Sequence, residues 1–396
     1  MGDNTKLVPE IRFKGFTDAW CLCKLGEVAD IFDGTHQTPN YTNIGVKFVS
    51  VENISNLSGT KKFISMEDYN SQFKNKATVG DIFMTRITAG IIGETAIVEN
   101  DEDFAYYVSL ALIKLRDGMN NAFVNYCINA NSFKNELNKR IIHTAFPKKI
   151  NLNEIGKCEM IYACPDEQQK IGTFFRTFES IIAKHKQKLD GLRELKKGYL
   201  QLMFPQAEKL VPQVRINGFT GNWEKQRVGN MFEVTRGQVL AATTVSEQKD
   251  ENNIYPVYSS QTKNNGLLGY YHKFLFDTAV TWTTDGANAG TVTFREGKFY
   301  STNVSGVLLS DKGFSNQCIA EALNLVAWRY VSRVGNPKIM NNIMAEIMIS
   351  APSLAEQTAI SNFIRKLDDN VTMQQSKLEQ LKQLKVAYLQ KMFVQN

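Results

Sequence analysis

The residues best suited to metal or nucleophilic chemistry are few and scattered in this chain of 396 residues. It has six cysteines and four histidines, and no two cysteines form a Cys-x-x-Cys pair. Zinc binding at Cys21-x-Cys23 would need further ligands, which the sequence does not supply at a suitable spacing. The histidines are too dispersed for a local Ser–His–acid set. We therefore interpret the cysteines as reduced or buried thiols, and we expect neither a metal site nor catalytic residues.

Two acidic motifs imitate a metal-dependent nuclease. These motifs are Pro165-Asp166 and Glu194-Leu195-Lys196, and such a nuclease needs its carboxylates to converge on a metal ion. The carboxylates are 28 residues apart (194 − 166) on one predicted helix, which separates them by about 42 Å at 1.5 Å per residue. A solvated helix face is the better interpretation. No Gly-Lys-Ser/Thr phosphate loop is present, and Asn336-Pro337-Lys338 lacks the aromatic residue of an adenine methyltransferase pocket.

Polar loops offer a different chemistry, which is the reading of base edges and phosphates. The loop DGTHQTPNY begins at Asp33. Its glutamine can pair bidentately with adenine and its threonines suit several bases, although an ordinary Asp-Gly turn would also explain it. Arg86 lies between threonines, where it could read guanine or clamp a phosphate, or be a surface arginine. Lys148 and Lys149 follow a proline and suit phosphate contacts.

The second half of the chain has polar segments that we interpret as counterparts. They read SSQTKNNGLLGYY from Ser259, TWTTDGANAG from Thr281 and GNPKIMNNI from Gly335. The predicted DNA-binding residues in the first half are Thr35, His36, Gln37, Thr38, Thr85, Arg86, Thr88, Lys148 and Lys149. Those in the second half are Ser260, Gln261, Thr262, Lys263, Asn264, Thr284, Asn288, Arg333, Asn336 and Lys338.

Composition permits this interpretation without demanding it. Hydrophobic residues make up 43% and charged residues 22%, which is typical of a globular protein. The net charge of +6 is mildly basic, so a polyanionic partner is allowed. We find no basic-then-apolar leader and no apolar run near the ~20 residues that span a bilayer. We expect a cytoplasmic protein with no membrane partner.

The segments that must position these loops occur twice in the sequence. LVPEIRFKGFTDAW begins at Leu7, and LVPQVRINGFTGNW begins 203 residues later (210 − 7). EQQKIGTFF at Glu167 returns as EQTAISNFI at Glu356, and YLQLMF at Tyr199 returns as YLQKMF at Tyr388, both with an offset of 189. Each half is thus an opening phrase, a variable body and a closing segment. An internal repeat of this kind decides the fold before any single motif does.

The closing segments predict long helices with a coiled-coil seam. Apolar residues recur every seven positions, with a second set three positions further on. Ser353 and Glu356 match the sequence pattern of a capping box. In this motif the serine side chain accepts a bond from a free backbone N–H of the first helical turn, and the glutamate side chain accepts one from the N–H of the serine. In the first copy, Asp166 and Glu167 face the positive helix end instead. The predicted seam and docking residues are Ile171, Phe174, Phe178, Ile181, Leu192, Leu195, Tyr199, Ile360, Phe363, Leu367, Leu381, Leu384 and Tyr388.

The bodies mix short β-like runs with late helical patterns, so each is predicted to be one α+β globule. The predicted fold is therefore α+β, with two globular domains separated by two long antiparallel coiled-coil helices and an internal pseudo-two-fold repeat. We divide the chain into a first domain at 1–163, a first helix at 164–204, a linker with a second domain at 205–350 and a second helix at 351–396.

The sequence resembles the specificity subunit of a type I restriction–modification system over essentially its whole length. The resemblance rests on the two P-x-x-x-x-GF-x-x-x-W openings, on CPDEQQKI and APSLAEQTAI before the heptads, and on DGTH-x-TP-x-Y and GNPKI in the bodies. The first copy departs from the usual Pro-x-Leu-x-Glu-Gln pattern at Cys164-Pro165-Asp166.

The resemblance implies a role in defence against foreign DNA. The bodies would be target-recognition domains, each reading half of a split sequence in double-stranded DNA. The two helices would dock two methyltransferase subunits, which bind S-adenosylmethionine and methylate adenines. Restriction subunits that use ATP and Mg²⁺ would complete the nuclease, while this chain would bind no cofactor and be non-catalytic. A coiled-coil scaffold whose bodies bind proteins is the alternative from another class, and a self-sufficient DNA methyltransferase or nuclease is the other.

Shortening both predicted helices tests whether they set the spacing of the half-sites. Deleting 185–191 together with 374–380 removes one heptad from each helix, which keeps the seam in register and shortens it by about 10 Å. At about 3.4 Å per base pair, the spacer in the methylated-adenine motif should shorten by about three base pairs. An unchanged spacer in a well-folded, active variant would contradict the idea.

Overall fold

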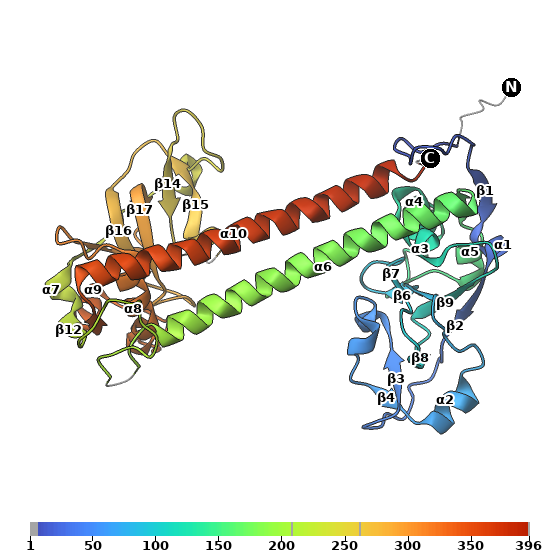
Figure 1. Ribbon diagram of the computed structural model, residues 1–396, viewed down its shortest axis with the longest axis horizontal. Coiled ribbons are helices and arrows are strands. Elements are labelled where there is room, and N and C mark those ends of the chain that lie inside the picture. The colour runs from blue at the N-terminus through green and yellow to red at the C-terminus, as the bar shows by residue number, and fades with distance from the viewer. Residues whose placement is uncertain (1–6, 207–208, 261–262, 395–396) are drawn as a thin grey trace. The chain divides into compact units, whose positions relative to one another are not determined.

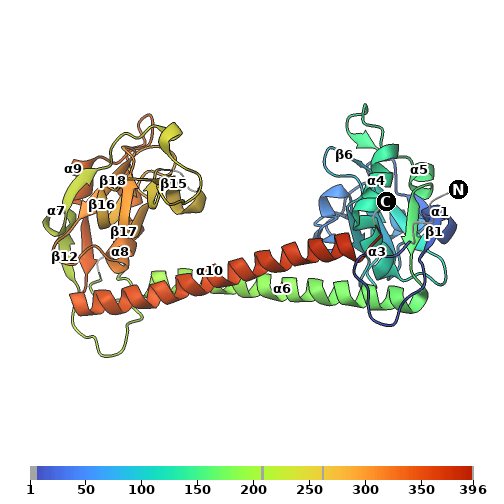
Figure 2. The ribbon, with the colours of Figure 1, turned by 90° about the horizontal axis from the view of Figure 1, so that it is seen from above.

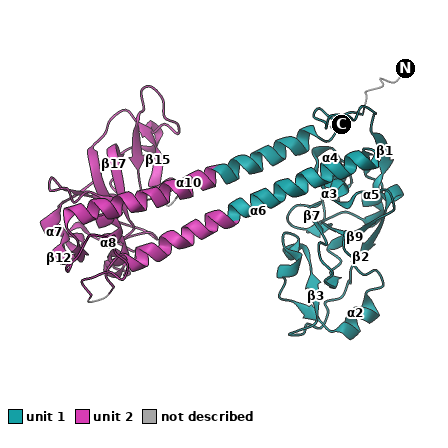
Figure 3. Cartoon of the chain, in the orientation of Figure 1, with its two compact units in different colours: residues 1–186, 377–396 teal, residues 187–376 magenta. Residues whose placement is uncertain are grey.

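The computed structural model describes residues 7–206, 209–260 and 263–394. The chain divides into two compact units, residues 1–186 with 377–396 (unit 1) and residues 187–376 (unit 2) (Figure 3). The two long helices are α6 (Pro165–Leu202) and α10 (Leu354–Lys391) (Figure 1). Each unit combines one body with the start of one long helix and the end of the other. The predicted α+β class, with two globular bodies, two long helices and an internal repeat, is confirmed.

The described residues of unit 1 form two sheets of three or more strands, together with the two-stranded pairs β1-β11 and β10-β6. The larger has the order β2-β9-β5-β7, with all neighbours antiparallel, and the smaller has the order β4-β3-β8. The strands are β1 (Cys21–Lys24), β2 (Ala29–Asp33), β3 (Val46–Val49), β4 (Phe63–Ile64), β5 (Ile82–Thr85), β6 (Ile87–Thr88), β7 (Thr95–Ile97), β8 (Phe104–Tyr106), β9 (Leu110–Leu115), β10 (Lys148–Lys149) and β11 (Glu159–Tyr162). The helices are α1 (Leu25–Val28), η1 (Val51–Asn53), η2 (Leu57–Gly59), α2 (Met66–Gln72), α3 (Asn121–Asn129), α4 (Asn131–Arg140) and α5 (Leu152–Gly156).

The larger sheet of unit 1 is buried on both faces, which explains the nearly continuous apolar letters of its central strands. Ile82 and Ile113 face a core shared with α3 and the start of α6. Phe83 and Leu112, one position along each strand, face a second core formed with the smaller sheet. Successive side chains of a strand point to opposite faces, so every position of β5 is buried. The sheet therefore holds the loops at its ends on a rigid support.

Unit 2 repeats this plan with one extended sheet. Its order is β13-β18-β16-β17-β14-β15, and its inner face packs on α8 through residues such as Trp282 and Leu308. The strands are β12 (Glu224–Arg227), β13 (Glu233–Arg236), β14 (Tyr255–Tyr258), β15 (Leu267–Tyr271), β16 (Phe276–Thr283), β17 (Val292–Ser301), β18 (Ser305–Leu309) and β19 (Met348–Ala351). The helices are α7 (Val228–Met231), η3 (Ala242–Thr244), η4 (Lys263–Gly266), α8 (Gln317–Ala327), η5 (Trp328–Tyr330) and α9 (Asn341–Glu346).

A buried carboxylate joins each opening phrase to the first turn of a long helix. Glu167 is fully buried and accepts two 2.7 Å bonds from the Arg12 guanidinium, together with a 3.1 Å bond from Trp20 Nε1. The bond to Glu167 raises the pKa of Arg12. In unit 2, Arg215 makes the same two-pronged bond to Glu356, at 2.8 and 2.7 Å. We call these two arrangements the clasps. Bidentate, charge-assisted bonds of this kind are strong and geometrically specific.

The clasp changes the predicted role of the glutamates. The Ser353 hydroxyl does accept a bond from the Glu356 amide, at 3.4 Å. The capping box is nevertheless incomplete, because the Glu356 carboxylate binds Arg215 instead of reaching back along the chain. The prediction was wrong at this point, since a capping pattern does not show that a distant arginine competes for the same carboxylate.

The glutamine that follows each clasp glutamate fixes a helix of the body. Gln168 Nε2 donates to the Ala163 carbonyl at 2.7 Å, and its Oε1 accepts from the Asn120 amide at 2.9 Å. Asn120 is the N-cap residue of α3. In unit 2, Gln357 Nε2 donates to the Pro352 carbonyl at 2.8 Å, and its Oε1 accepts from the side-chain Nδ2 of Asn316, the N-cap residue of α8, at 2.8 Å. The Glu-Gln pair thus ties opening phrase, long helix and body together.

Each opening phrase also meets the end of the other long helix. The Ile11 amide donates to the Lys391 carbonyl at the end of α10, at 2.9 Å. The Val214 amide donates to the Leu202 carbonyl at the end of α6, at 3.0 Å. The two donors are 203 residues apart (214 − 11) and the two acceptors 189 (391 − 202), which are the offsets of the sequence repeat. Trp20 packs on Phe393 and Trp223 on Phe204 in the same pattern.

The long helices run antiparallel in both units. In unit 1, the end of α10 lies beside the start of α6 (Figures 1 and 2). Phe174 contacts Tyr388 there, and Glu179 accepts a bond from Lys385. In unit 2, Tyr199 contacts Phe363, and Lys196 donates to Asp368 at 2.6 Å. Partner numbers rise on one helix as they fall on the other, as the predicted pairing requires.

The second set of predicted seam positions needs correction. The first set is buried or half-buried, and it consists of Ile171, Phe178, Leu192, Tyr199, Ile360, Leu367, Leu381 and Tyr388. The companion position lies four residues further on rather than three, at Phe175, Ile182, Leu189, Ile364 and Leu378. Ile181, Leu195 and Leu384 are therefore exposed, whereas Phe174 and Phe363 still touch the facing helix. The sequence has apolar residues both three and four positions after the first set, so only the packing of the helices shows which of the two positions is buried.

Removing a clasp carboxylate should destabilise one unit selectively. Glu167→Ala leaves the Arg12 guanidinium, whose side chain is 11% exposed, without its partner, and breaking a buried ion pair costs about 3–5 kcal/mol. Hydrogen exchange should accelerate in α3 of unit 1 and remain unchanged in α8 of unit 2.

Glu194→Ala is the matched control, because that glutamate is 77% exposed and should leave both helices protected. Equal protection of α3 in Glu167→Ala and in the unchanged chain would show that the clasp does not support unit 1.

Candidate nucleic-acid interface

Three of the segments predicted to contact DNA meet around one buried arginine in unit 1. The Arg86 guanidinium donates from Nη1 to the Val108 carbonyl at 3.0 Å and from Nε to the Ile150 carbonyl at 3.3 Å. Its Nη1 also lies 3.5 Å from the Asp33 carboxylate. Asp33 begins the first polar loop and Ile150 follows the lysine pair. The arginine therefore joins the segments 33–41, 86–93 and 142–150, which we call the reading segments of unit 1.

The predicted role of Arg86 as a base or phosphate contact was wrong. Its side chain is 9% exposed and burial lowers its pKa, an effect that the Asp33 carboxylate partly offsets. Thr85 is also buried and bonds the Ile91 carbonyl. Neither residue can reach a base or a phosphate as the chain is folded. They hold the reading segments in place. An arginine between two threonines looks the same in the sequence whether it contacts DNA or supports the fold, so the sequence could not distinguish the two roles.

The other predicted residues of unit 1 are accessible. His36, Gln37 and Thr38 are exposed, and Thr35 and Thr88 are half-buried. Strand β10 pairs with β6, so that Lys148 lies opposite Thr88 and Lys149 opposite Ile87. His36 Nε2 lies 2.9 Å from the Asp33 carboxylate, so the first loop is tied to the arginine that holds the lysine strand. Exposed donors and acceptors from three segments thus gather at one end of the sheet.

Unit 2 builds the same frame with a neutral residue at its centre. Thr284 is fully buried, and its amide donates to the Val304 carbonyl at 3.1 Å, as the Arg86 amide donates to the Ser109 carbonyl at 2.9 Å. The Thr284 hydroxyl also bonds Val304, at 2.9 Å, whereas the Arg86 guanidinium bonds Val108. The Ile339 amide donates to the Thr284 carbonyl at 2.9 Å, as Ile150 donates to Arg86. After Arg86 and Thr85, Thr284 is thus the third predicted contact residue that is structural. Asn288 is half-buried on the same segment, and Arg333, Asn336 and Lys338 are exposed on the next loop.

The predicted counterpart of the first polar loop was wrong. Strand β14 runs parallel to β17 as β3 runs parallel to β8, so the segment after β14 takes the place of the one after β3. Ser260 and the exposed Asn264 lie there, with Lys263 at the start of η4. Gln261 and Thr262 lie outside the described residues.

The true counterpart of the first loop begins at Gly237. The Gln238 backbone bridges Thr302 as the Thr35 backbone bridges Tyr107. A Cβ on Gly34 would collide with the Tyr106 carbonyl, and one on Gly237 with the Ser301 carbonyl, so both positions require glycine. The reading segments of unit 2 are therefore 236–244, 284–290 and 332–339. The sequence held a signal for this, because the two glycines are 203 residues apart (237 − 34), like the opening phrases.

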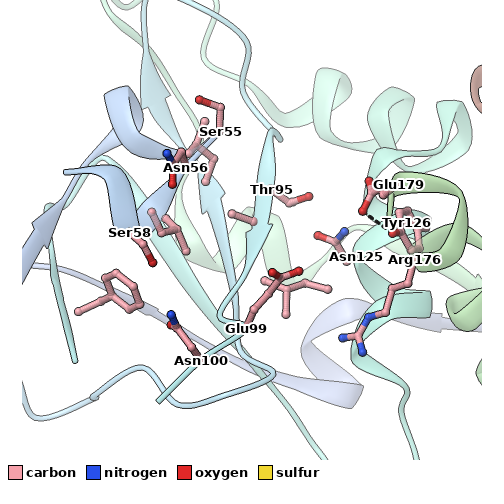
Figure 4. Close-up of a pocket in the computed structure, with 15 residues that line it drawn as sticks. Ser55, Asn56, Ser58, Thr95, Glu99, Asn100, Asn125, Tyr126, Arg176 and Glu179 are labelled. Atoms are coloured by element: carbon pink, nitrogen blue, oxygen red, sulfur yellow. Dashed lines mark hydrogen bonds between the residues drawn. The ribbon is translucent and has the colours of Figure 1, made fainter. Parts of the chain in front are cut away.

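A separate polar pocket of unit 1 lies outside these segments. It has a volume of about 380 Å³; Ser55, Asn56 and Ser58 line one side and Tyr126, Arg176 and Glu179 the other (Figure 4). The Tyr126 hydroxyl donates to Glu179 at 2.7 Å. Glu99 and Glu179 give its lining more negative than positive charge, which does not suit a phosphate.

Within the described ranges there is neither a cluster of three metal-ligating side chains nor a helix able to cross a bilayer.

Two α+β bodies that present matched loops, each clasped to long antiparallel helices, define a protein with two recognition modules on one scaffold. The sequence profile described as "Type I restriction modification DNA specificity domain" matches residues 18–194 and 220–383. The chain therefore belongs to the type I restriction–modification DNA specificity family, and its two modules are DNA specificity domains.

Known proteins agree with this assignment. A protein of Mycoplasma pneumoniae described as a type I specificity subunit is 29% identical over 235 residues, which is 58% of this chain and 82% of that protein. The crystal structure of a type I S subunit from M. genitalium has the same fold, with a TM-score of 0.67, 15% identity, and coverage of 98% of this chain and 99% of that one. A chain from a structure describing complex assembly and conformational transition of the type I R–M system superposes with a TM-score of 0.55 and 14% identity, over 93% and 96% of the two chains.

The exposed and buried cations of unit 1 should behave differently on substitution. Lys149→Ala should weaken DNA binding and reduce the slope of log K against log salt by about one, because one phosphate contact is lost. Arg86→Ala should instead accelerate hydrogen exchange at the Ile150 amide, since the frame loses its centre. Binding measured by fluorescence anisotropy across a salt series, with Lys134→Ala on α4 as an exposed-lysine control, distinguishes the two effects. A normal salt slope for Lys149→Ala would place the DNA on another face.

Proposed function

We propose that this chain reads a split target in double-stranded DNA, with one half-site for each body, as the non-catalytic subunit of a cytoplasmic type I restriction–modification complex. The observation that carries the proposal is the matched frame of reading segments in the two units. Positions held by backbone bonds are equivalent, whereas the exposed side chains differ, as at His36 and Val239 or at Phe146 and Val334. Equal frames with unequal side chains suit two different half-sites.

The long helices provide the second part of the proposal. The start of α6 with the end of α10, and the start of α10 with the end of α6, are matched pairs with the same clasp. A repeated surface within one chain suits two copies of one partner. We infer that two methyltransferase subunits dock there, using exposed apolar residues such as Ile181, Leu195 and Leu384. Those subunits would supply S-adenosylmethionine, and two restriction subunits would supply ATP-dependent cleavage with Mg²⁺.

Exchanging one body tests whether the half-sites are read independently. Replacing residues 224–350 with the matching body of another specificity subunit leaves the opening phrase, Arg215 and Glu356 in place, so the clasp should form again. The complex of this variant with its methyltransferase should methylate a motif altered in one half only, which sequencing of modified adenines would show. The reciprocal exchange of residues 21–163 should alter the other half, and a change in both halves from either exchange would contradict the proposal.

A further inference from the structure

The two most exposed large apolar side chains among the described residues occupy the same loop in the two units. Phe146 is 92% exposed in the third reading segment of unit 1, and Val334 is 87% exposed in the third reading segment of unit 2. The loops are matched by their bonds as well as by their order in the chain. The Ile142 amide donates to the Lys149 carbonyl, and the Ser332 amide to the Lys338 carbonyl, at 2.8 and 2.9 Å.

The base of each loop is fixed, whereas its apolar tip has no cover. In unit 1 the loop closes on β10, which pairs with β6, and the following Ile150 amide bonds the Arg86 carbonyl at 3.0 Å. In unit 2, the Gly286 amide bonds the Pro337 carbonyl at 2.9 Å. A tip on such a base does not collapse onto its own body, so Phe146 and Val334 stay exposed at the interface.

The surroundings of each tip match a nucleic acid rather than an apolar protein surface. Lys148 and Lys149 are exposed around Phe146, and Arg333 and Lys338 around Val334. Cations beside an apolar tip suit phosphates on both sides of a groove, with the tip directed at the bases. An apolar partner protein would have to bury these charges, which is costly when they are unpaired.

The groove offers one kind of apolar atom on a base edge. In the major groove this is the C5-methyl group of thymine, which small and large apolar side chains can both contact. A wedge that unstacks a base step in the minor groove is the other use of an apolar tip, and it is built from bulky side chains. Phenylalanine and valine differ in size, and they share only the ability to make an apolar contact.

We propose that Phe146 and Val334 each contact the C5-methyl group of a thymine in the half-site read by their own body, and so select an A·T pair at that position. This inference rests on the proposed function, because it assumes that the reading segments face DNA. It assigns a base-selecting role to two residues that carry no hydrogen-bonding group in their side chains.

The test uses the complex of the full chain with its methyltransferase subunits and a duplex containing its own methylation motif. Each thymine of the half-site read by unit 1 is replaced singly by deoxyuridine, which removes only the methyl group. At one thymine, affinity should fall about fourfold, which corresponds to about 0.8 kcal/mol for one buried methyl-sized group. Phe146→Ala should lower affinity for the unmodified duplex and should abolish the further loss at that thymine, because the two changes remove the same contact.

Two variants serve as controls. Phe146→Leu should keep the sensitivity to deoxyuridine, since leucine preserves the apolar contact. Met66→Ala removes another exposed apolar side chain of unit 1, on α2, and should leave both affinity and deoxyuridine sensitivity unchanged.

The outcomes separate this inference from the proposed function. A complex that does not prefer its motif over a scrambled duplex would overturn both. Specific binding in which no thymine is coupled to Phe146, or in which the half-site has no thymine on either strand, would overturn the methyl contact alone. Specific binding in which 2-aminopurine fluorescence rises with the unchanged complex but not with Phe146→Ala would show unstacking, and would replace the methyl contact with a wedge.

Discussion

A carboxylate buried in the first turn of each long helix is the interaction on which the rest of the molecule depends. Glu167 and Glu356 are each 0–1% exposed, and each receives both prongs of an arginine from the opening phrase of its own half. An unpaired carboxylate at such a position would be expensive. The helix start, the opening phrase and the body helix capped through the adjacent glutamine must therefore assemble together.

The clasps also show how two copies of one plan differ in detail. Trp20 Nε1 completes the first clasp with a bond to Glu167, whereas Trp223 Nε1 is buried and makes no hydrogen bond within the described part of the chain. A buried donor without a partner costs about 1–3 kcal/mol. The first clasp leaves a different donor, Arg12 Nη1, without a partner among the described residues, whereas Arg215 Nη1 donates to the Gly221 carbonyl at 2.6 Å. Both tryptophans pack on the phenylalanine that ends the opposite helix.

Rigid frames with variable tips explain how recognition can change without loss of the fold. The reading segments are tied by backbone bonds and by a buried residue, Arg86 in one unit and Thr284 in the other. The residues free to vary lie outward of these bonds, where substitutions usually change stability by less than about 0.5 kcal/mol. A charged centre and a neutral centre support the same geometry, because the backbone amide of each bonds the carbonyl just before the following strand, which is Ser109 in unit 1 and Val304 in unit 2.

The sequence by itself determined the larger organisation of this protein. Repeated phrases with offsets of 203 and 189 gave two halves, and heptads gave two long helices, because these patterns are local and period-dependent. Loops rich in polar letters indicated the ends of the sheets that gather at the interface. The recurrence of Arg12 and Glu167 with those same offsets was also visible, but not that they bind each other.

Only the tertiary structure showed which of two similar residues is buried and which is exposed. It placed Arg86, Thr85 and Thr284 inside the frame, moved the companion seam positions by one residue, and diverted Glu356 from its own helix to Arg215. It also matched Gly237 rather than Ser259 with the first loop, because strand pairing rather than composition defines equivalence. The clasps join partners 155 and 141 residues apart, and the bonds of Arg86 to Val108 and of Thr284 to Val304 still span 22 and 20 residues, so no local pattern contains them.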